Sequence, residues 1–202
     1  MIAQLAGQLY LKGLRMKSVT IAQRLGIVVL LAIVSIVVHE FGHFIVYRLA
    51  GCPVRITLQS VRPTGHVSAP LNLLALAAGP AFSLIAAVLC LLLARRRPSF
   101  FLITAAFTNA TLRLFPLVLD IVQAIGKTRP FSDEGDVVIA ITTNPGARAV
   151  LLLSVFAVFL SLTLVVARRY RFEKHRAAKI VGIYLLSLAV GIAVLLVDEM
   201  LH

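Results

Sequence analysis

Three ionisable residues stand close together inside an apolar stretch of the chain: His39, Glu40 and His43, in the string HEFGH. On an α-helix, residues four apart lie on the same face, so the two imidazoles can bind one metal ion together. Zinc in such a site lowers the pKa of a coordinated water to about 7. The carboxylate beside the first histidine can then accept a proton as the water attacks a carbonyl. The spacing therefore predicts a zinc-dependent hydrolytic site.

The surroundings of this string distinguish the prediction from a simpler one. In a soluble helix, two core histidines satisfied by hydrogen bonds and a glutamate paired with a basic residue would explain the same pattern. Here the run GIVVLLAIVSIVV leads directly into His39. Charged groups at the centre of a bilayer cost about 2.5–3.5 kcal/mol each on insertion scales. We therefore expect a metal ion or a water-filled cavity around these three residues.

Two histidines leave the site one ligand short, because catalytic zinc usually has three protein ligands and a water. The remaining candidates are acidic residues of the third apolar stretch and the loop after it: Asp120, Asp133, Glu134 and Asp136. Asp120 also has a structural interpretation, since Arg113 lies seven residues earlier on the same helix face and could pair with it. If Asp120 is the ligand, residues 126–136 are only a solvated acidic loop.

The composition indicates which elements position these residues. Of the 202 residues, 60% are hydrophobic and only 14% are charged, which excludes an ordinary soluble domain and a disordered chain. A membrane-spanning helix needs about 20 mostly apolar residues. The sequence predicts an all-α polytopic membrane protein with about five such helices, over residues 21–49, 71–94, 100–125, 147–167 and 177–197.

Two connections between these helices carry more than a turn. Residues 52–69 suggest two short β segments around Pro63-Thr64-Gly65, which predicts a hairpin after the first helix. His66 in this hairpin is interpreted as a surface or substrate-side residue. Residues 126–136 form a polar loop in which Ser132 can cap a short helix whose first turn is acidic.

The net charge of +12 is mostly a matter of position. Most basic residues fall in the N-terminal segment 1–19, in the loop after the second helix and in the loop after the fourth helix. By the positive-inside rule, these segments face the cytoplasm and the C-terminus does not. Nucleic-acid binding is therefore not expected, and the lipid bilayer is the expected environment.

At the level of motifs, the chain resembles the site-2 protease family of intramembrane zinc metalloproteases. The resemblance rests on HEFGH in an apolar helix, on Gly65-His66-Val67 in a β-like segment and on Ala78-Gly79-Pro80 in the next helix. It implies a three-helix catalytic core over about residues 20–140, which excludes residues 1–19 and the two helices in residues 141–202. It also implies that Gly65, His66 and Val67 bind the substrate.

The second motif of that family, an Asn followed by Pro-rich sequence and Leu-Asp-Gly, is not fully matched. Leu119-Asp120 copies its Leu-Asp but is followed by Ile121. In the family the ligand Asp follows an irregular, Pro-containing segment and begins a helix, which favours Asp133 over Asp120 as the third ligand. Asn109 resembles the family's Asn, which holds the substrate backbone. An amide there could also orient a developing oxyanion, and an interhelical hydrogen bond is its alternative role.

Together these features predict an intramembrane zinc endopeptidase that cleaves a transmembrane segment of a membrane-protein substrate, in a prokaryotic cell membrane. His39, His43 and Asp133 would hold Zn²⁺, Glu40 would transfer protons and Asn109 would assist. A metal transporter and an inactive family relative that binds a partner are the alternatives. The basic loops place the motif toward the non-cytoplasmic face, whereas members of the family usually hold the zinc nearer the cytoplasm.

Overall fold

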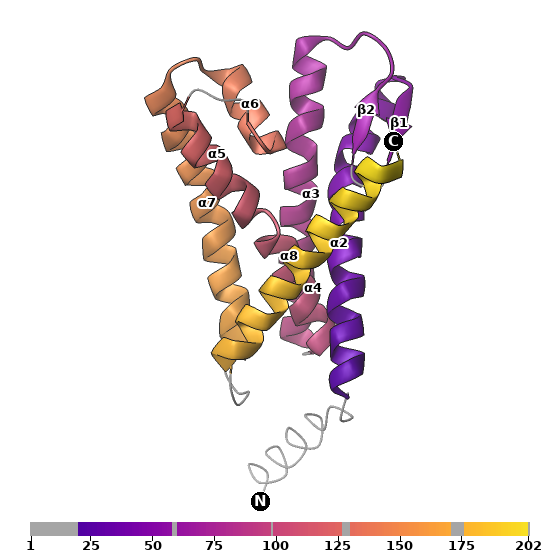
Figure 1. The fold of residues 1–202 in the computed structure, drawn as a ribbon, viewed down its shortest axis with the longest axis vertical. Helices are drawn as coiled ribbons and strands as arrows, with labels where there is room; N and C mark the ends of the chain where they lie inside the picture. Colours follow the sequence, from indigo (N-terminus) through magenta and orange to yellow (C-terminus); the bar gives the residue numbers. More distant parts are fainter. Residues whose placement is uncertain (1–19, 58–59, 98, 127–129, 171–175, 202) are drawn as a thin grey trace, which may run out of the picture.

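The computed structural model describes residues 20–57, 60–97, 99–126, 130–170 and 176–201; the predicted basic segment 1–19 lies outside them (Figure 1). This described part of the chain is mostly helical, with one two-stranded sheet. In chain order the elements are α2 (Ile21–Leu49), β1 (Val54–Ile56), β2 (Val61–Pro63), α3 (Ala69–Arg96), α4 (Phe100–Thr111), α5 (Leu114–Gly126), α6 (Asp133–Ile141), α7 (Pro145–Ala167), the 3₁₀-helix η1 (Arg168–Tyr170) and α8 (Arg176–Leu201).

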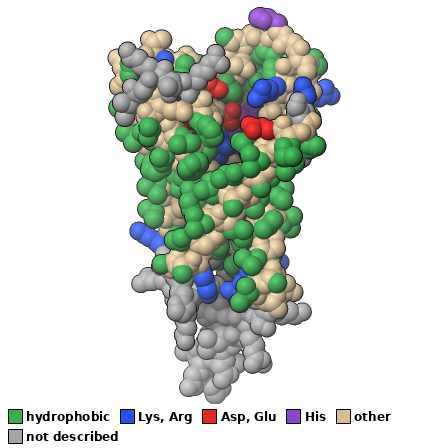
Figure 2. Space-filling view, viewed as in Figure 1, with side chains coloured by type: hydrophobic (Ala, Val, Ile, Leu, Met, Phe, Trp, Pro, Cys, Tyr) green, Lys and Arg blue, Asp and Glu red, His purple; other side chains and the backbone are tan. Residues whose placement is uncertain are grey.

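Within the described residues, five segments are long and apolar enough to cross a membrane, which confirms the predicted number of spans. They are α2, α3, the combined segment Phe100–Ala124, α7 and the segment Ala177–Leu201 within α8. Their outer faces carry exposed large apolar side chains, which cover most of the visible surface between the two ends of the molecule (Figure 2). The hairpin, α6 and the C-terminal end of α8 gather at the end opposite the start of α2 (Figure 1).

The third span is broken near its middle. The sequence predicts one helix over 100–125, whereas the structure ends α4 at Thr111 and begins α5 at Leu114. Pro116 lies in the first turn of α5, where its missing N–H costs no helical hydrogen bond. The turn between the two helices holds Leu112 and Arg113, and so brings a charged side chain to the interior of the bundle.

The hairpin is present, but its turn lies elsewhere than predicted. Strands β1 and β2 pair antiparallel, with Val54 opposite Pro63 and Ile56 opposite Val61, so the turn falls before Val61 rather than at Pro63-Thr64-Gly65. Proline is tolerated in β2 because this strand is an edge of a two-stranded sheet. The Val61 side chain packs against Tyr47 and Ala75, which attaches the hairpin to α2 and α3.

Helices α2 and α3 approach each other closely at two glycines. A Cβ added at Gly42 would lie 2.5 Å from the carbonyl oxygen of Ala78, and one added at Gly79 would collide with the His43 ring. Small residues at such contacts let two membrane helices bring their backbones together. The two glycines therefore set the distance between α3 and the histidine face of α2.

Replacing Gly42 by alanine should push α2 and α3 apart. The cost of such overpacking is about 1–3 kcal/mol of unfolding free energy, and it should appear as a lower thermal unfolding temperature of the detergent-solubilised protein. Gly26→Ala on the same helix is the control, because a Cβ at Gly26 meets nothing within 4 Å. Equal unfolding temperatures for the two variants would contradict this account of the contact.

Candidate metal centre

The two histidines of HEFGH lie on the buried face of α2, where they are 3% and 4% exposed. His43 Nδ1 lies 2.8 Å from the carbonyl oxygen of Ala75, and His39 Nδ1 lies 3.3 Å from Ser83 Oγ. A carbonyl oxygen only accepts, so His43 carries its proton on Nδ1 and presents the lone pair of Nε2. The two Nε2 atoms face each other at 3.1 Å.

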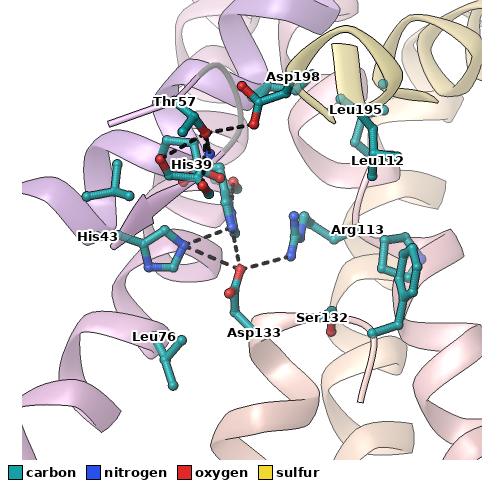
Figure 3. Close-up of a pocket in the computed structure, with 18 of the residues that line it drawn as sticks. His39, His43, Thr57, Leu76, Leu112, Arg113, Ser132, Asp133, Leu195 and Asp198 are labelled. Carbon is teal, nitrogen blue, oxygen red and sulfur yellow. Dashed lines mark hydrogen bonds and ion pairs between the residues drawn. The ribbon is translucent and has the colours of Figure 1, made fainter. Parts of the chain in front are cut away.

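Asp133 approaches both of these nitrogens. It is the first residue of α6, and Ser132 caps the helix through a hydrogen bond from the Gly135 N–H to its hydroxyl. The Asp133 Oδ2 atom lies 2.8 Å from His39 Nε2 and 3.3 Å from His43 Nε2 (Figure 3). One carboxylate oxygen and two imidazole nitrogens, one from each histidine, therefore form a compact triangle between α2 and α6.

The dimensions of this triangle suit a tetrahedral metal ion. Ligand atoms at the usual zinc distances of 2.0–2.1 Å are about 3.3 Å apart in a tetrahedron, and the three edges here measure 2.8, 3.1 and 3.3 Å. Ser83 Oγ can donate or accept, so His39 can present either a proton or a lone pair at Nε2. In the second case a cation between the two Nε2 atoms relieves the repulsion of their lone pairs. His39, His43 and Asp133 therefore fit a divalent metal by geometry and by donor type.

Glu40 completes the cluster from the same helix. Its carboxylate and the ligand nitrogens of His39 and His43 all lie within 4.8 Å of one another. The backbone N–H of Val61, on β2, lies near this carboxylate. Glu40 thus lies between the histidine pair and the hairpin, and both line the same cavity.

Asp120, the alternative third ligand, serves a different purpose. Its carboxylate accepts hydrogen bonds from the backbone N–H of Phe131, at 2.5 Å, and from the backbone N–H and hydroxyl of Ser132. It lines a small separate cavity rather than the one that contains the histidines. Asp120 therefore holds the loop that leads into α6 and so positions Asp133 through Ser132.

The predicted pairing of Asp120 with Arg113 is wrong. That pairing assumed one continuous helix, and the break at Leu112 and Arg113 removes the shared face. Arg113 instead binds Glu134, with Nε and Nη2 at 3.0 and 2.9 Å from the two carboxylate oxygens, and its Nη2 lies 3.5 Å from Asp133 Oδ2. Sequence reasoning missed Arg113 as a site residue, although a charged residue in an apolar span was a usable signal.

The two acidic residues at the start of α6 are held in their charged form. Burial alone would raise the pKa of Asp133, but hydrogen bonds to His39 and His43 and the nearby Arg113 guanidinium hold it well below its usual range. Burial would likewise raise the pKa of Glu134, and the Arg113 guanidinium outweighs this effect and lowers it. Glu134 neutralises Arg113, which leaves the Asp133 charge for a metal.

A cavity of about 1080 Å³ surrounds the cluster. Its walls come from α2, the hairpin, the α4–α5 turn, α6 and α8, and Asn109 on α4 also lines it. Asn109 Nδ2 donates to the Ala105 carbonyl oxygen at 2.9 Å, and its Oδ1 has no hydrogen-bond partner among the described residues.

The residues predicted to bind substrate lie away from this cavity. Gly65 and His66 are exposed, Val67 is half-buried, and none of the three lines the cavity wall. The hairpin contributes its strand residues instead, among them Arg55, Val61 and Arg62.

Comparisons of the chain with models of protein families, with curated proteins and with solved structures found no match.

The two candidate third ligands can be separated by metal analysis of the purified protein. Asp133→Ala should lower zinc affinity by more than about 100-fold, because losing a ligand should exceed the 10–100-fold effect of losing an outer partner. Asp120→Asn should keep one zinc per chain and unfold at a lower temperature, because it weakens the hydrogen bonds that hold Ser132. Asp136→Asn, in the same turn of α6 as Asp133, should leave zinc content unchanged. Loss of zinc from Asp120→Asn alone would make Asp120 the ligand.

Proposed function

We propose that this protein is an intramembrane zinc endopeptidase, similar to the site-2 proteases, that cleaves a transmembrane segment of a membrane-protein substrate. One observation carries the proposal: Asp133 Oδ2 lies within 3.3 Å of both histidine Nε2 atoms, beside Glu40, in a bundle with five apolar helices. HEFGH supplies two ligands and the general base of a hydrolytic zinc site, and Asp133 on α6 supplies the third ligand.

Each residue of the cluster has a role in peptide hydrolysis. His39, His43 and Asp133 would hold Zn²⁺, which when bound polarises a carbonyl and makes water a stronger nucleophile at neutral pH. Glu40 accepts the proton of the attacking water and then delivers it to the leaving amine. The Val61 N–H of the hairpin lies near the Glu40 carboxylate.

The substrate must unwind before it can react, because a peptide bond in lipid is protected by helical hydrogen bonding. An unwound segment needs new partners for its backbone groups, and an exposed strand edge provides them. Thr57 N donates to Ser60 O, and Thr64 N donates to Pro53 O. Hydrogen-bonded and non-hydrogen-bonded pairs alternate along an antiparallel ladder, so the Ile56–Val61 pair is a non-hydrogen-bonded one. The backbone groups of Val61 therefore face away from β1. A substrate strand along this edge of β2 would pass beside Glu40.

Asn109 lines the same cavity from α4. Its Nδ2 donates one of its two hydrogens to the Ala105 carbonyl oxygen. Its Oδ1 is buried and has no hydrogen-bond partner among the described residues. We assign Asn109 to assisting at the substrate backbone through the second hydrogen of Nδ2.

The proposed site lies toward the non-cytoplasmic side of a prokaryotic cell membrane. The structure places HEFGH in the half of α2 away from Thr20, and Arg95, Arg96 and Arg168 lie at helix ends on the Thr20 side (Figure 1). Clustered basic residues mark cytoplasmic loops. This orientation is opposite to the usual one in site-2 proteases.

Metal transport is the alternative that uses the same side chains. A relay of metal ions across the membrane needs several binding positions along its path, whereas an alternating-access transporter uses a site near the middle of the membrane. Over the described parts of the chain, one cluster of three or more potential ligands suits a metal ion, at HEFGH. Measured Zn²⁺ flux into vesicles that contain the protein would favour transport.

Glu40→Gln should bind one zinc per chain and fail to cleave. Loss of a general base typically lowers the rate by about 10²–10⁴-fold. The measurement is cleavage, in proteoliposomes, of fluorescent-protein fusions to single transmembrane segments with a central Gly or Pro, residues that favour unwinding. Removing the metal with a chelator should abolish cleavage by the wild type, and added Zn²⁺ should restore it.

Arg48→Gln is the control, because Arg48 lies on the same helix, is exposed and does not line the cavity. Undiminished cleavage by Glu40→Gln would refute the mechanism. A wild-type protein that is purified without zinc and does not take it up would favour an inactive relative.

A further inference from the structure

Arg113 places a guanidinium at the edge of the proposed metal site, and the mechanism above leaves it without a role. It lies in the turn between α4 and α5 and lines the cavity together with His39 and Glu40. Its Nη2 atom lies 3.5 Å from Asp133 Oδ2, the same oxygen that approaches both histidines (Figure 3). The positive charge is thus next to the position at which the reaction would take place.

Glu134 fixes the orientation of this guanidinium. Two parallel hydrogen bonds, from Nε and Nη2, tie Arg113 to the Glu134 carboxylate, which is 5% exposed. Such a bidentate pair restricts the guanidinium to one plane and one direction. The side chain is therefore preorganised before any ligand enters the cavity.

One end of the guanidinium is left unused. The bonds to Glu134 and the contact with Asp133 occupy Nε and Nη2, and Nη1 has no hydrogen-bond partner among the described residues. Nη1 is not among the buried polar atoms that lack a partner, so it is accessible. Two N–H donors on a fixed cation are thus available to a ligand in the cavity.

The proposed reaction needs such donors. When water attacks, a bond forms between its oxygen and the carbonyl carbon, the π electrons of C=O move to the carbonyl oxygen, and Glu40 takes the proton. The C–N bond then breaks, the C=O bond re-forms and the nitrogen receives the proton from Glu40. A negative charge builds up on the carbonyl oxygen in between, and fixed donors that face it lower the barrier.

Asn109 is neutral and already donates one of its two Nδ2 hydrogens to Ala105, so it offers at most one uncharged donor. The described hairpin places one backbone N–H near the cluster, that of Val61, beside the Glu40 carboxylate. Among the described residues, Arg113 is the arginine that forms an ion pair with Asp133.

We propose that Arg113 is a catalytic residue whose Nη1 hydrogen-bonds the carbonyl oxygen of the scissile peptide and stabilises the oxyanion, with Glu134 as the positioning residue that holds it. This inference rests on the proposed function of the same site. The rival role is structural: Arg113 only orients Asp133 for the metal.

The test compares three variants of the full chain in proteoliposomes. Arg113→Gln alone would leave Glu134 buried and unpaired, so the double variant Arg113→Gln/Glu134→Gln replaces the ion pair by two amides that can bond to each other. Glu134→Gln keeps the guanidinium, and Arg113→Lys keeps a cation without the fork. The readouts are zinc content, kcat and KM on the transmembrane fusions, and binding of a phosphinic peptide, whose tetrahedral anion imitates the oxyanion.

We expect the double variant to retain one zinc per chain and nearly unchanged KM, and to lose about 10²–10³-fold in kcat, as expected for removal of an oxyanion donor. Its affinity for the phosphinic peptide should fall by about tenfold or more, the effect of losing one charge-assisted hydrogen bond. Glu134→Gln should lose much less on both measures, and Arg113→Lys should lie between them.

Three results would overturn the inference. Loss of zinc from the double variant would assign Arg113 to orienting Asp133. Equal kcat and equal phosphinic-peptide affinity in the double variant and in Glu134→Gln would show that the guanidinium does not contact the oxyanion. A wild-type protein that neither cleaves nor binds the phosphinic peptide would reject this inference together with the proposed function. If the wild type cleaves and the Glu40→Gln variant does not, the proposed function stands whatever the Arg113 variants do.

Discussion

The architecture of the site depends on holding two imidazole Nε2 atoms 3.1 Å apart inside an apolar bundle. Such a pair is unfavourable by itself, and it is retained because backbone and side-chain partners fix both Nδ1 atoms and a carboxylate approaches both Nε2 atoms. The close packing of α2 on α3 at Gly42 and Gly79 keeps the ring of His43 against its carbonyl partner. Helix packing in this protein thus serves the orientation of metal-binding groups.

The carboxylate of Asp133 reaches the histidines through a series of supports. The break in the third span ends α4 and turns α5 so that Asp120 meets the loop before α6. Asp120 holds Ser132, and Ser132 caps the helix that begins with Asp133. The sequence offers Asp120 and Asp133 for the same role, and the structure gives them different ones. Asp133 contacts the two histidines, and Asp120 holds the loop that positions Asp133.

Charge is distributed so that few groups are left unbalanced within the bundle. Arg113 and Glu134 neutralise each other through two hydrogen bonds, and both would be costly alone in an apolar environment. Because Arg113 is bonded to Glu134, it makes only a longer ion pair with Asp133, with Nη2 at 3.5 Å from Oδ2. A divalent metal would complete the balance, and a cavity of about 1080 Å³ adjoins the position that it would occupy.

The sequence by itself determined the features that depend on local periodicity. Helical spacing puts His39 and His43 on one face whatever surrounds them, and runs of apolar residues predict the five spans and most of their bounds. The choice of Asp133 over Asp120 at the histidine pair, the Arg113–Glu134 pair and the position of the hairpin turn were decided only by the tertiary structure. Asp133 lies 94 residues from His39. No local pattern specifies a contact over that separation, because it depends on where the third span breaks and how α6 packs on α3.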